Sequence, residues 1–299
     1  MIKIANAPCS WGILEFGLDG NTNTYEKVLN EMHETGYLGT ELGDWGFMPS
    51  EPNQLKVELD QRKLNLVGAF VPVNFKNPAD HESGLNLALK TARLLKETDP
   101  EHARIVLSDD NGKNETRTKL TGRIKPEHSL SPDNWRVFAN GVENIAKTVK
   151  DETGLNCVFH HHCAGYIETP WEIEKLLDST SPEYVNLCFD TGHYAFGGGD
   201  PVEALTQFRE RIGHVHFKDW SRTIFDEVVE DGLDYFEAVG KGIFCELGKG
   251  SIDFSAVLDE LNKQKYSGWI VVEQDVLPGM GSPKESAKRN RDFLTSIGL

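Results

Sequence analysis

The stretch 185-VNLCFDTGHYAFGGGDPVEALTQFRERIGHVHFKDW-220 holds two short apolar runs separated by one helix pattern. Both runs are continuous and apolar, as in strands that are buried on both faces of a parallel sheet. Between them, Asp200-Pro201 supplies a cap and a proline for the first position of a helix. The stretch therefore predicts a strand–helix–strand unit.

The same alternation runs through the whole chain of 299 residues. Eight strand–helix repeats in a chain of this length predict a (β/α)8 TIM barrel, formed as one domain by residues 1–299. A doubly wound open sheet is the alternative, but no GxGxxG motif follows the first strand. The predicted strands cover 2–8, 38–45, 65–73, 103–110, 155–162, 185–193, 212–220 and 269–276, and the predicted helices cover 24–35, 51–63, 83–97, 131–153, 169–179, 200–211, 253–265 and 282–296.

One segment, residues 221–252, breaks this alternation between the seventh strand and its helix. It is long and rich in Gly, Asp and Phe. Long loops after barrel strands are usually functional, for example as lids. We therefore predict a loop insertion that closes over a site.

The net charge, the cysteines and the lack of long apolar runs exclude several classes of protein. The formal net charge of -16 opposes a nucleic-acid partner, because no basic surplus displaces counterions from phosphates. The five cysteines are odd in number and form no CxxC pair, which predicts free thiols in a reducing compartment. Neither a signal-peptide pattern nor an apolar run of membrane-spanning length is visible. We expect a soluble cytoplasmic protein whose oligomeric state, a homo-oligomer included, is left open.

Ligand-type side chains collect at the predicted strand ends, where TIM barrels place their active sites. Six of the ten histidines fall between residues 160 and 216, in three of the predicted strands. Asp190 lies in one of these strands, and Glu273 lies in a fourth. Each residue has a simpler interpretation alone: a packed histidine, a loop cap or a buried ion pair. Their convergence from four strands favours a metal site, and mixed imidazole and carboxylate donors suit Mn²⁺, Co²⁺, Zn²⁺ or Fe²⁺ better than Ca²⁺.

The three consecutive histidines in 158-VFHHHCAGYIETP-170 are separated by strand alternation. Successive side chains of a strand point to opposite faces, so His160 and His162 share one face. His161 points the other way, and we expect it to pack against the helices. The same parity places His214 and His216 together.

Aromatic residues also follow the predicted strands. Trp11, Trp45 and Trp220 can line the mouth of the barrel, with Glu41 at the end of the second strand. Core packing at the rim explains the tryptophans equally well. Aromatic faces with a few polar groups suit a polyhydroxylated ring as substrate.

Seven motifs are spread over nearly the whole chain: 5-ANAPCSWG-12, 40-TELGDWGFMP-49, 160-HHHCAGYIETP-170, 189-FDTGHYAFGGGDP-201, 214-HVHFKDW-220, 246-ELGKGSIDF-254 and 269-WIVVEQD-275. Together they resemble the inosose dehydratase family, the 2-keto-myo-inositol dehydratases of inositol catabolism. That family belongs to the xylose-isomerase-like TIM barrels, together with sugar epimerases and endonuclease IV.

The resemblance implies a metal site and substrate contacts. Asp190, His216 and Glu273 match the ligands that the superfamily takes from strands six, seven and eight. Its strand-five Glu is absent here, and His160 stands at that place, with His162 as the other candidate. The resemblance also implies substrate contacts by His193 and Arg222, a Co²⁺ or Mn²⁺ cofactor, and glutathione as an associated molecule.

The mechanism that fits is a hydro-lyase reaction on a cyclic polyhydroxy ketone. A metal-stabilised enediolate forms on loss of the α-proton, with Glu273, His162 or His193 as the base. Lys218, a histidine or a metal-bound water then protonates the leaving hydroxyl. A sugar isomerase or epimerase that shares the enediolate is the alternative. An AP endonuclease and a non-enzymatic binding module are further alternatives, the former opposed by the acidic charge.

Overall fold

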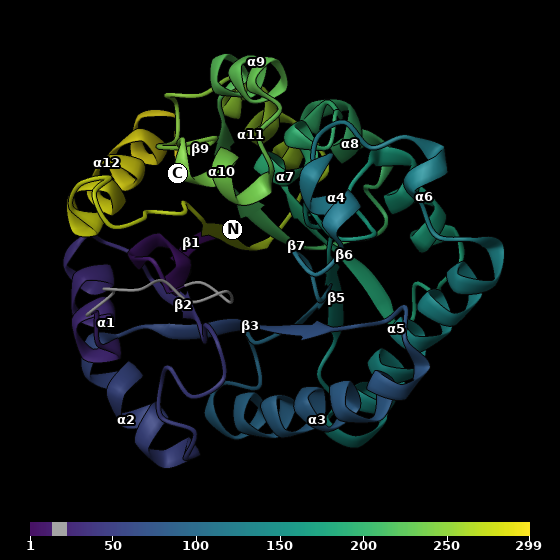
Figure 1. Cartoon of the computed structure of the whole chain (residues 1–299). Coiled ribbons are helices and arrows are strands. Elements are labelled where there is room, and N and C mark those ends of the chain that lie inside the picture. Colours follow the sequence, from purple (N-terminus) through teal and green to yellow (C-terminus); the bar gives the residue numbers. More distant parts are fainter. Residues whose placement is uncertain (14–22) are drawn as a thin grey trace.

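The computed structural model describes residues 1–13 and 23–299. These residues contain a closed barrel of eight parallel strands (Figure 1). Neighbouring strands follow the chain order, and the first pairs with the last, so the predicted (β/α)8 barrel is confirmed. Its strands are β1 (Ile2–Asn6), β2 (Gly39–Glu41), β3 (Asn65–Val73), β4 (Ile105–Asp109), β5 (Cys157–His160), β6 (Val185–Asp190), β7 (Ile212–Phe217) and β10 (Gly268–Val272).

Helices surround this barrel, and all eight predicted helices are present, although the one expected over 200–211 ends at Gln207. They are α1 (Tyr25–Glu34), α2 (Pro52–Arg62), α3 (His81–Thr98), α5 (Pro132–Thr153), α6 (Pro170–Asp178), α8 (Pro201–Gln207), α11 (Phe254–Lys263) and α12 (Pro283–Ser296). The predicted caps are real in α5, where the Ser131 side chain accepts the Asn134 N–H and Gly154 ends the helix at φ 80°. Local signals and apolar faces therefore define this outer layer together.

Short elements that the sequence did not predict decorate the connections. They are the 3-10 helices η1 (Pro8–Trp11), η2 (Pro78–Asp80) and η3 (Pro126–His128), and the helices α4 (Glu115–Lys119) and α7 (Thr191–Phe196). Helix α7 corrects the expected strand over 185–193. The strand ends at Asp190, whose carboxylate accepts the His193 N–H and starts the helix. His193 consequently lies on a helix.

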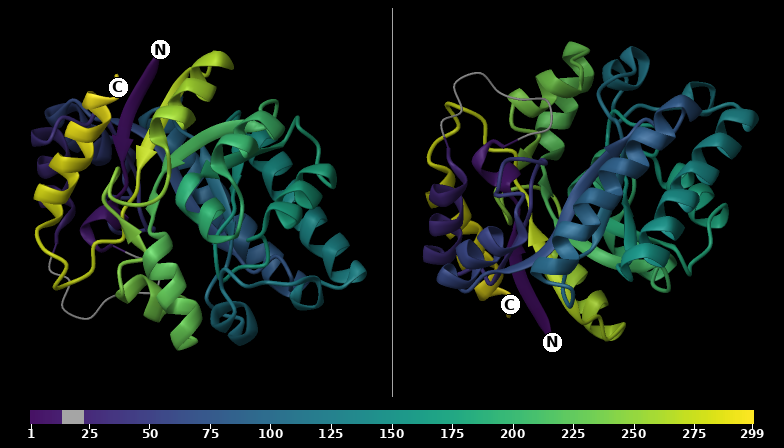
Figure 2. Two further views of the ribbon diagram at one scale, coloured as in Figure 1. Left: turned by 90° about the horizontal axis from the view of Figure 1, so that it is seen from above. Right: turned by 90° about the horizontal axis from the view of Figure 1, so that it is seen from below.

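The segment expected to be a long loop after the seventh strand is folded. It contains α9 (Arg222–Asp231) and α10 (Tyr235–Gly240), and it returns so that β9 (Phe244–Cys245) pairs antiparallel with β8 (Asp219–Trp220). Its apolar residues, including Val228, Tyr235 and Phe244, form a second buried cluster together with Cys163 and Phe196 of the connections after β5 and β6. The two views of Figure 2 place these helices at the end of the barrel opposite both chain termini (Figure 2).

One carboxylate fastens the base of this insertion. Asp219 accepts the backbone N–H groups of Trp220, Gly248, Gly250 and Ile252 at 2.8–3.3 Å. A Cβ at Gly250 would lie 2.2 Å from the same carboxylate, so this position has no room for a side chain. Asp219 therefore joins the two ends of the insertion.

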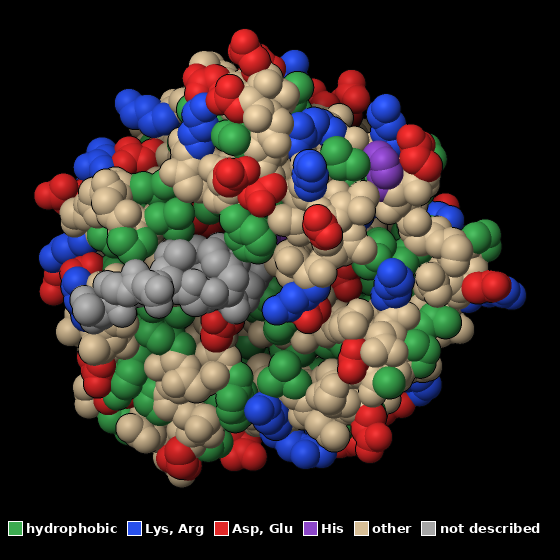
Figure 3. All heavy atoms as spheres, viewed as in Figure 1, with side chains coloured by type: hydrophobic (Ala, Val, Ile, Leu, Met, Phe, Trp, Pro, Cys, Tyr) green, Lys and Arg blue, Asp and Glu red, His purple; other side chains and the backbone are tan. Residues whose placement is uncertain are grey.

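The surface carries charges of both signs. Figure 3 shows acidic and basic side chains mixed over the face seen in Figure 1 (Figure 3). Within residues 1–13 and 23–299, the structure has no helix that is both long enough and apolar enough to span a membrane.

Candidate active site

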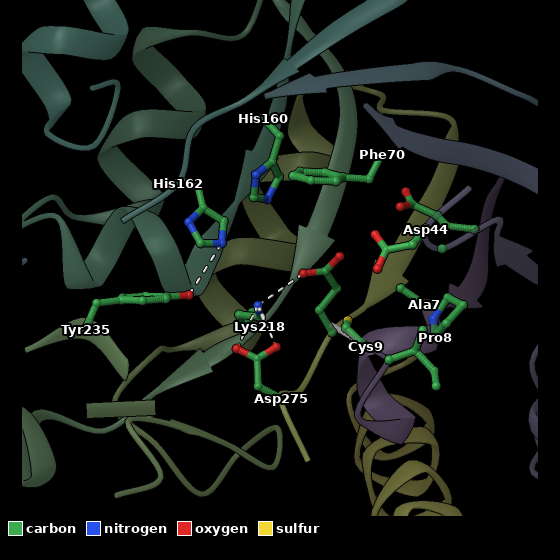
Figure 4. Close-up of a pocket in the computed structure, with 14 residues that line it drawn as sticks. Ala7, Pro8, Cys9, Asp44, Phe70, His160, His162, Lys218, Tyr235 and Asp275 are labelled. Atoms are coloured by element: carbon green, nitrogen blue, oxygen red, sulfur yellow. Dashed lines mark hydrogen bonds and ion pairs between the residues drawn. The ribbon is translucent and has the colours of Figure 1, made fainter. Parts of the chain in front are cut away.

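A pocket of about 600 Å³, partly open to solvent, lies where the barrel strands end. In Figure 4, His160, His162, Lys218 and Asp275 lie on one side, and Ala7, Pro8 and Asp44 lie on the other (Figure 4). The pocket thus combines apolar groups with charged and polar ones, which suits a small ring with hydroxyl substituents. The described residues that line it are Ala7, Pro8, Cys9, Ile13, Glu41, Gly43, Asp44, Phe70, His160, His162, Lys218, Tyr235, Glu273 and Asp275.

Four side chains at one edge of this pocket form a group that can hold a divalent cation. His160, Asp190, His216 and Glu273 each offer a donor atom, and these atoms lie within 4.8 Å of one another. His216 Nδ1 is 3.2 Å from Glu273 Oε1 and 3.8 Å from Asp190 Oδ2. His160 Nε2 is 3.6 Å from Asp190 Oδ2. Neutral imidazole and carboxylate donors of this kind suit Mn²⁺, Co²⁺, Zn²⁺ or Fe²⁺.

The hydrogen bonding of this group fits a metal site. Across the two described ranges, Asp190 Oδ2, His216 Nδ1 and both ring nitrogens of His160 are buried and have no hydrogen-bond partner. Buried polar atoms nearly always have a hydrogen-bond partner. Several buried nitrogen and oxygen atoms without one, all in one place, therefore require an explanation. A cation between them supplies the missing partner.

The two carboxylate oxygens of Asp190 have different contacts, and one of them holds the side chain in place. Its Oδ1 accepts the His193 N–H at 2.7 Å, which caps α7. The other oxygen, Oδ2, is the one that faces His160 and His216. One carboxylate therefore anchors a helix and contributes to the ligand group.

His162 presents a hydrogen-bond acceptor at the pocket. Its Nδ1 lies 2.6 Å from the carbonyl oxygen of Cys163, so Nδ1 carries the hydrogen. Burial lowers the pKa of His162 well below its usual value, which leaves the ring neutral. Its Nε2 then accepts from the Tyr235 hydroxyl at 3.4 Å. The His193 ring packs behind it, with the two ring centroids 3.9 Å apart.

Lys218 is a buried ammonium between two carboxylates. Its Nζ lies 3.2 Å from Glu273 Oε2 and 3.3 Å from Asp275 Oδ1. Burial alone would lower the pKa of Lys218, but the charges of Asp275 and Glu273 outweigh it and raise the pKa well above its usual value. Lys218 therefore brings a held proton to the pocket.

Comparisons with known proteins agree with this fold. A family model described as the xylose isomerase-like TIM barrel matches residues 23–297. An inosose dehydratase of Geobacillus kaustophilus is 31% identical over 99% of this chain and 94% of its own length. Inosose dehydratase 2 of Bacillus cereus is 32% identical over 98% of this chain and 96% of its own. This chain belongs to the inosose dehydratase family of xylose isomerase-like TIM barrels.

Solved structures share the fold of this inosose dehydratase family member at low sequence identity. The probable 3-DHS dehydratase AsbF of Bacillus anthracis has a TM-score of 0.73 and 16% identity, and the match covers 98% of both chains. The IOLI protein with a binding zinc atom has a TM-score of 0.73 and 13% identity, covering 99% of this chain and 97% of its own. An L-ribulose 3-epimerase has a TM-score of 0.70 and 15% identity, covering 99% and 94%. At these identities the likeness shows the fold.

Of the six side chains expected to contact substrate in this inosose dehydratase family member, only Glu41 is among the described residues that line the pocket, and His193 packs against the His162 ring. Trp11 turns inward in η1 and donates to Glu31, and Trp220 is buried in the cluster of the insertion. Trp45 lies under the Lys90 ammonium, and Arg222 is largely exposed and paired with Asp226. None of these four side chains is among the described residues that line the pocket. The three tryptophans and Arg222 lie at or after the ends of predicted strands, but η1 holds Trp11, β8 holds Trp220 and α9 holds Arg222.

Several residues that line the pocket were missing from the expected site, among them Asp275 and Tyr235. Asp275 follows Glu273 by two residues, and that spacing at a strand end was a usable signal. Tyr235 comes from the insertion and carries no motif. His161 packs as expected: it is fully buried, its Nε2 accepts the Asp190 N–H at 3.2 Å, and its ring lies against Tyr194 of α7.

The turn after β5, which carries His162, is held in a strained shape by a buried carboxylate. Ala164 has φ 66°, in the left-handed region that a residue with a Cβ rarely adopts. Glu168 accepts the Ala164 N–H at 2.8 Å and the Gly122 N–H at 2.7 Å. Such strain persists only where neighbouring contacts enforce it, and it is typical of functional sites.

We expect Ala164→Gly and Ala164→Val to differ clearly in stability. Glycine tolerates this φ, so Ala164→Gly should change the free energy of unfolding by less than about 1 kcal/mol. A β-branched residue does not, so Ala164→Val should lose about 2 kcal/mol or more. Urea titrations of both variants measure the difference, and equal losses would show that the left-handed conformation is not what limits this position.

The same turn predicts a dependence of stability on pH. Burial raises the pKa of Glu168 to about 7, against the opposing effects of Arg117 and two N–H groups. Because the unfolded value is near 4.5, the stability contributed by Glu168 is complete below that pH and is lost as pH rises through 7. Between pH 4.5 and 8, wild type should lose about 3 kcal/mol relative to Glu168→Gln. Parallel unfolding free energies across this range would contradict the prediction.

Proposed function

We propose that this protein is a hydro-lyase that removes water from 2-keto-myo-inositol (inosose) to give a trihydroxycyclohexane-dione in myo-inositol catabolism. The observation that carries the proposal is the position of an unsatisfied ligand group beside His162 and Lys218 at one pocket. Full-length relatives named inosose dehydratase support the choice of substrate.

The metal ligands in this proposal are His160, Asp190, His216 and Glu273. We propose Mn²⁺ or Co²⁺ as the resident ion, with Zn²⁺ as an alternative. When bound, such a cation supplies Lewis-acid polarisation of a carbonyl oxygen. The association of the family with glutathione stays a prediction.

His162 and Lys218 divide the proton transfers. Nε2 of His162 carries no hydrogen, because Nδ1 donates to the Cys163 carbonyl. Once substrate displaces the long contact from the Tyr235 hydroxyl, Nε2 takes the proton from the carbon next to the ketone. Lys218 holds a proton between Glu273 and Asp275 and gives it to the departing hydroxyl, which leaves as water. His193 supports the His162 ring from behind. One proton and one hydroxide leave neighbouring carbons, and together they account for the one water that a dehydration removes.

His160 favours elimination over epimerisation. The resemblance places a glutamate at this position in the superfamily, where epimerases use two glutamates as paired bases. A neutral imidazole leaves the bound cation one charge more positive and removes one of the two bases. Both effects support loss of hydroxide rather than return of the proton to carbon.

The direct test is turnover of 2-keto-myo-inositol by purified protein with Mn²⁺ or Co²⁺. We expect the absorbance of a conjugated dione to grow, and chelator-treated protein to give none until metal is restored. An epimerised ring with no dione would replace the dehydratase proposal by the isomerase alternative.

The remaining partners follow from the same proposal. The substrate is a small cyclic polyol ketone, and we propose a cytoplasmic location, supported by five cysteines that all lie in the described ranges as free thiols. Whether the protein forms a homo-oligomer and whether it avoids nucleic acid stay predictions from composition.

A further inference from the structure

Glu41, at the end of β2, lies between two histidines of β7. Its Oε1 is 2.9 Å from His214 Nε2 and 2.9 Å from His216 Nε2, and all three side chains are buried. A carboxylate oxygen accepts hydrogen bonds, so both Nε2 atoms carry hydrogens. This contact leaves the Nδ1 atom of His216 to face the ligand group.

The two nitrogens of His216 thus have separate tasks. Nε2 is occupied by Glu41, whereas Nδ1 faces Asp190 and Glu273 and has no hydrogen-bond partner among the described residues. Histidines that bind metals almost always donate their other ring N–H to a carboxylate or carbonyl, which orients the ring and makes it a stronger ligand. Glu41 has this relation to His216.

The barrel contains two backbone features that make room for this carboxylate. The register between β2 and β3 shifts between Thr40 and Glu41, so that Glu41 pairs with Gly68. A Cβ at Gly68 would lie 2.9 Å from Glu41 Oε1 and 3.2 Å from its Cδ. A register shift re-aims a side chain, and the absent side chain at residue 68 leaves space for it.

We propose that Glu41 is a positioning residue, which orients His216 to bind the metal through Nδ1 and strengthens that bond, with His214 fixing the other side of the carboxylate. This role differs from the substrate contact expected for Glu41 from its strand-end position. The inference rests on the proposed metal site, although not on the identity of the substrate.

Glu41, His214 and His216 could themselves form a second cation site, because their donor atoms lie close enough together. That arrangement would require His216 to bind one cation through each ring nitrogen. A single cation with Glu41 in an outer position satisfies all of the contacts with an ordinary neutral histidine, and metal stoichiometry separates the two.

The test is titration of metal-free protein with Co²⁺, followed by calorimetry and by visible absorption. We expect one Co²⁺ per chain in wild type and a dissociation constant about 10- to 100-fold higher in Glu41→Ala, with a changed Co²⁺ spectrum. Gly68→Ala, which alters no residue that lines the pocket, should weaken binding in the same direction by displacing the carboxylate. Glu41→Gln keeps the acceptor oxygen and should lose less than Glu41→Ala.

Asp44→Ala is the matched control, because Asp44 is another acidic residue of the pocket and lies on the opposite wall. Its Co²⁺ affinity should stay within about twofold of wild type. Circular dichroism of each metal-free variant checks that the barrel has formed.

Three results would overturn the inference: wild type that binds no Co²⁺, two Co²⁺ per chain, or Glu41→Ala and Gly68→Ala proteins that bind as tightly as wild type. In the last case, a raised KM in Glu41→Ala would establish a substrate contact instead. Wild type that binds Co²⁺ but makes no dione would refute the proposed function and leave the role of Glu41 supported by the affinities.

Discussion

Asp190→Asn should keep its fold and lose metal affinity on the order of 100-fold or more, since even outer-shell changes cost 10- to 100-fold. The reason is the division of labour within this carboxylate. Its Oδ1 caps α7, and an asparagine oxygen can do the same, whereas Oδ2 faces the ligand group and an amide nitrogen cannot bind a cation. We expect kcat for dehydration to fall on the order of 10³-fold.

Calorimetric titration with Mn²⁺ and thermal unfolding without metal measure the two functions of Asp190 separately. Asp190→Ala is the control, because it removes the cap as well and should lose about 1 kcal/mol of stability that Asp190→Asn retains. Normal Mn²⁺ binding by Asp190→Asn would remove Asp190 from the ligand set.

Lys218→Met should lower kcat by about 10²- to 10⁴-fold, the usual contribution of a positioned proton donor. It should also cost about 3–5 kcal/mol of stability, because Glu273 and Asp275 lose the ammonium between them. A low rate in this variant alone would therefore not distinguish loss of the proton donor from loss of the folded structure.

The double variant Lys218→Met, Asp275→Asn makes that separation. Removing the charge of Asp275 together with that of Lys218 should restore much of the stability. Turnover should stay low, because the proton donor Lys218 is still missing. Urea unfolding and the rate of dione formation give the two readings. Recovery of activity together with stability would show that Lys218 acts only by balancing charge.

The barrel and most of its ligand group were predictable because both depend on local regularities. Buried parallel strands are continuous apolar runs, and their last residues must meet at one end of a closed barrel. His160, Asp190 and His216 end such runs, so their convergence followed from the count of strands. The structure brings these three side chains close to Glu273.

Side chains beyond the strand ends were less predictable, because turns direct them. Trp11 follows β1, but η1 rotates its indole toward Glu31. Tyr235 reaches the pocket only because α9 and α10 fold over a shared apolar cluster, which is a tertiary contact without a local pattern. The αL turn at Ala164 depends in the same way on a distant carboxylate, Glu168.

The bonds of Asp219 have a consequence for how this family can diversify. One carboxylate joins both ends of the insertion, whereas the inner face of the insertion packs on Cys163, Ala164 and Phe196 of the barrel connections. The ligand group belongs to the barrel, whereas Tyr235 belongs to the insertion. Substitutions on the outer face of the insertion should therefore be tolerated, whereas a change at Tyr235 or Phe244 reaches His162 and His193 directly.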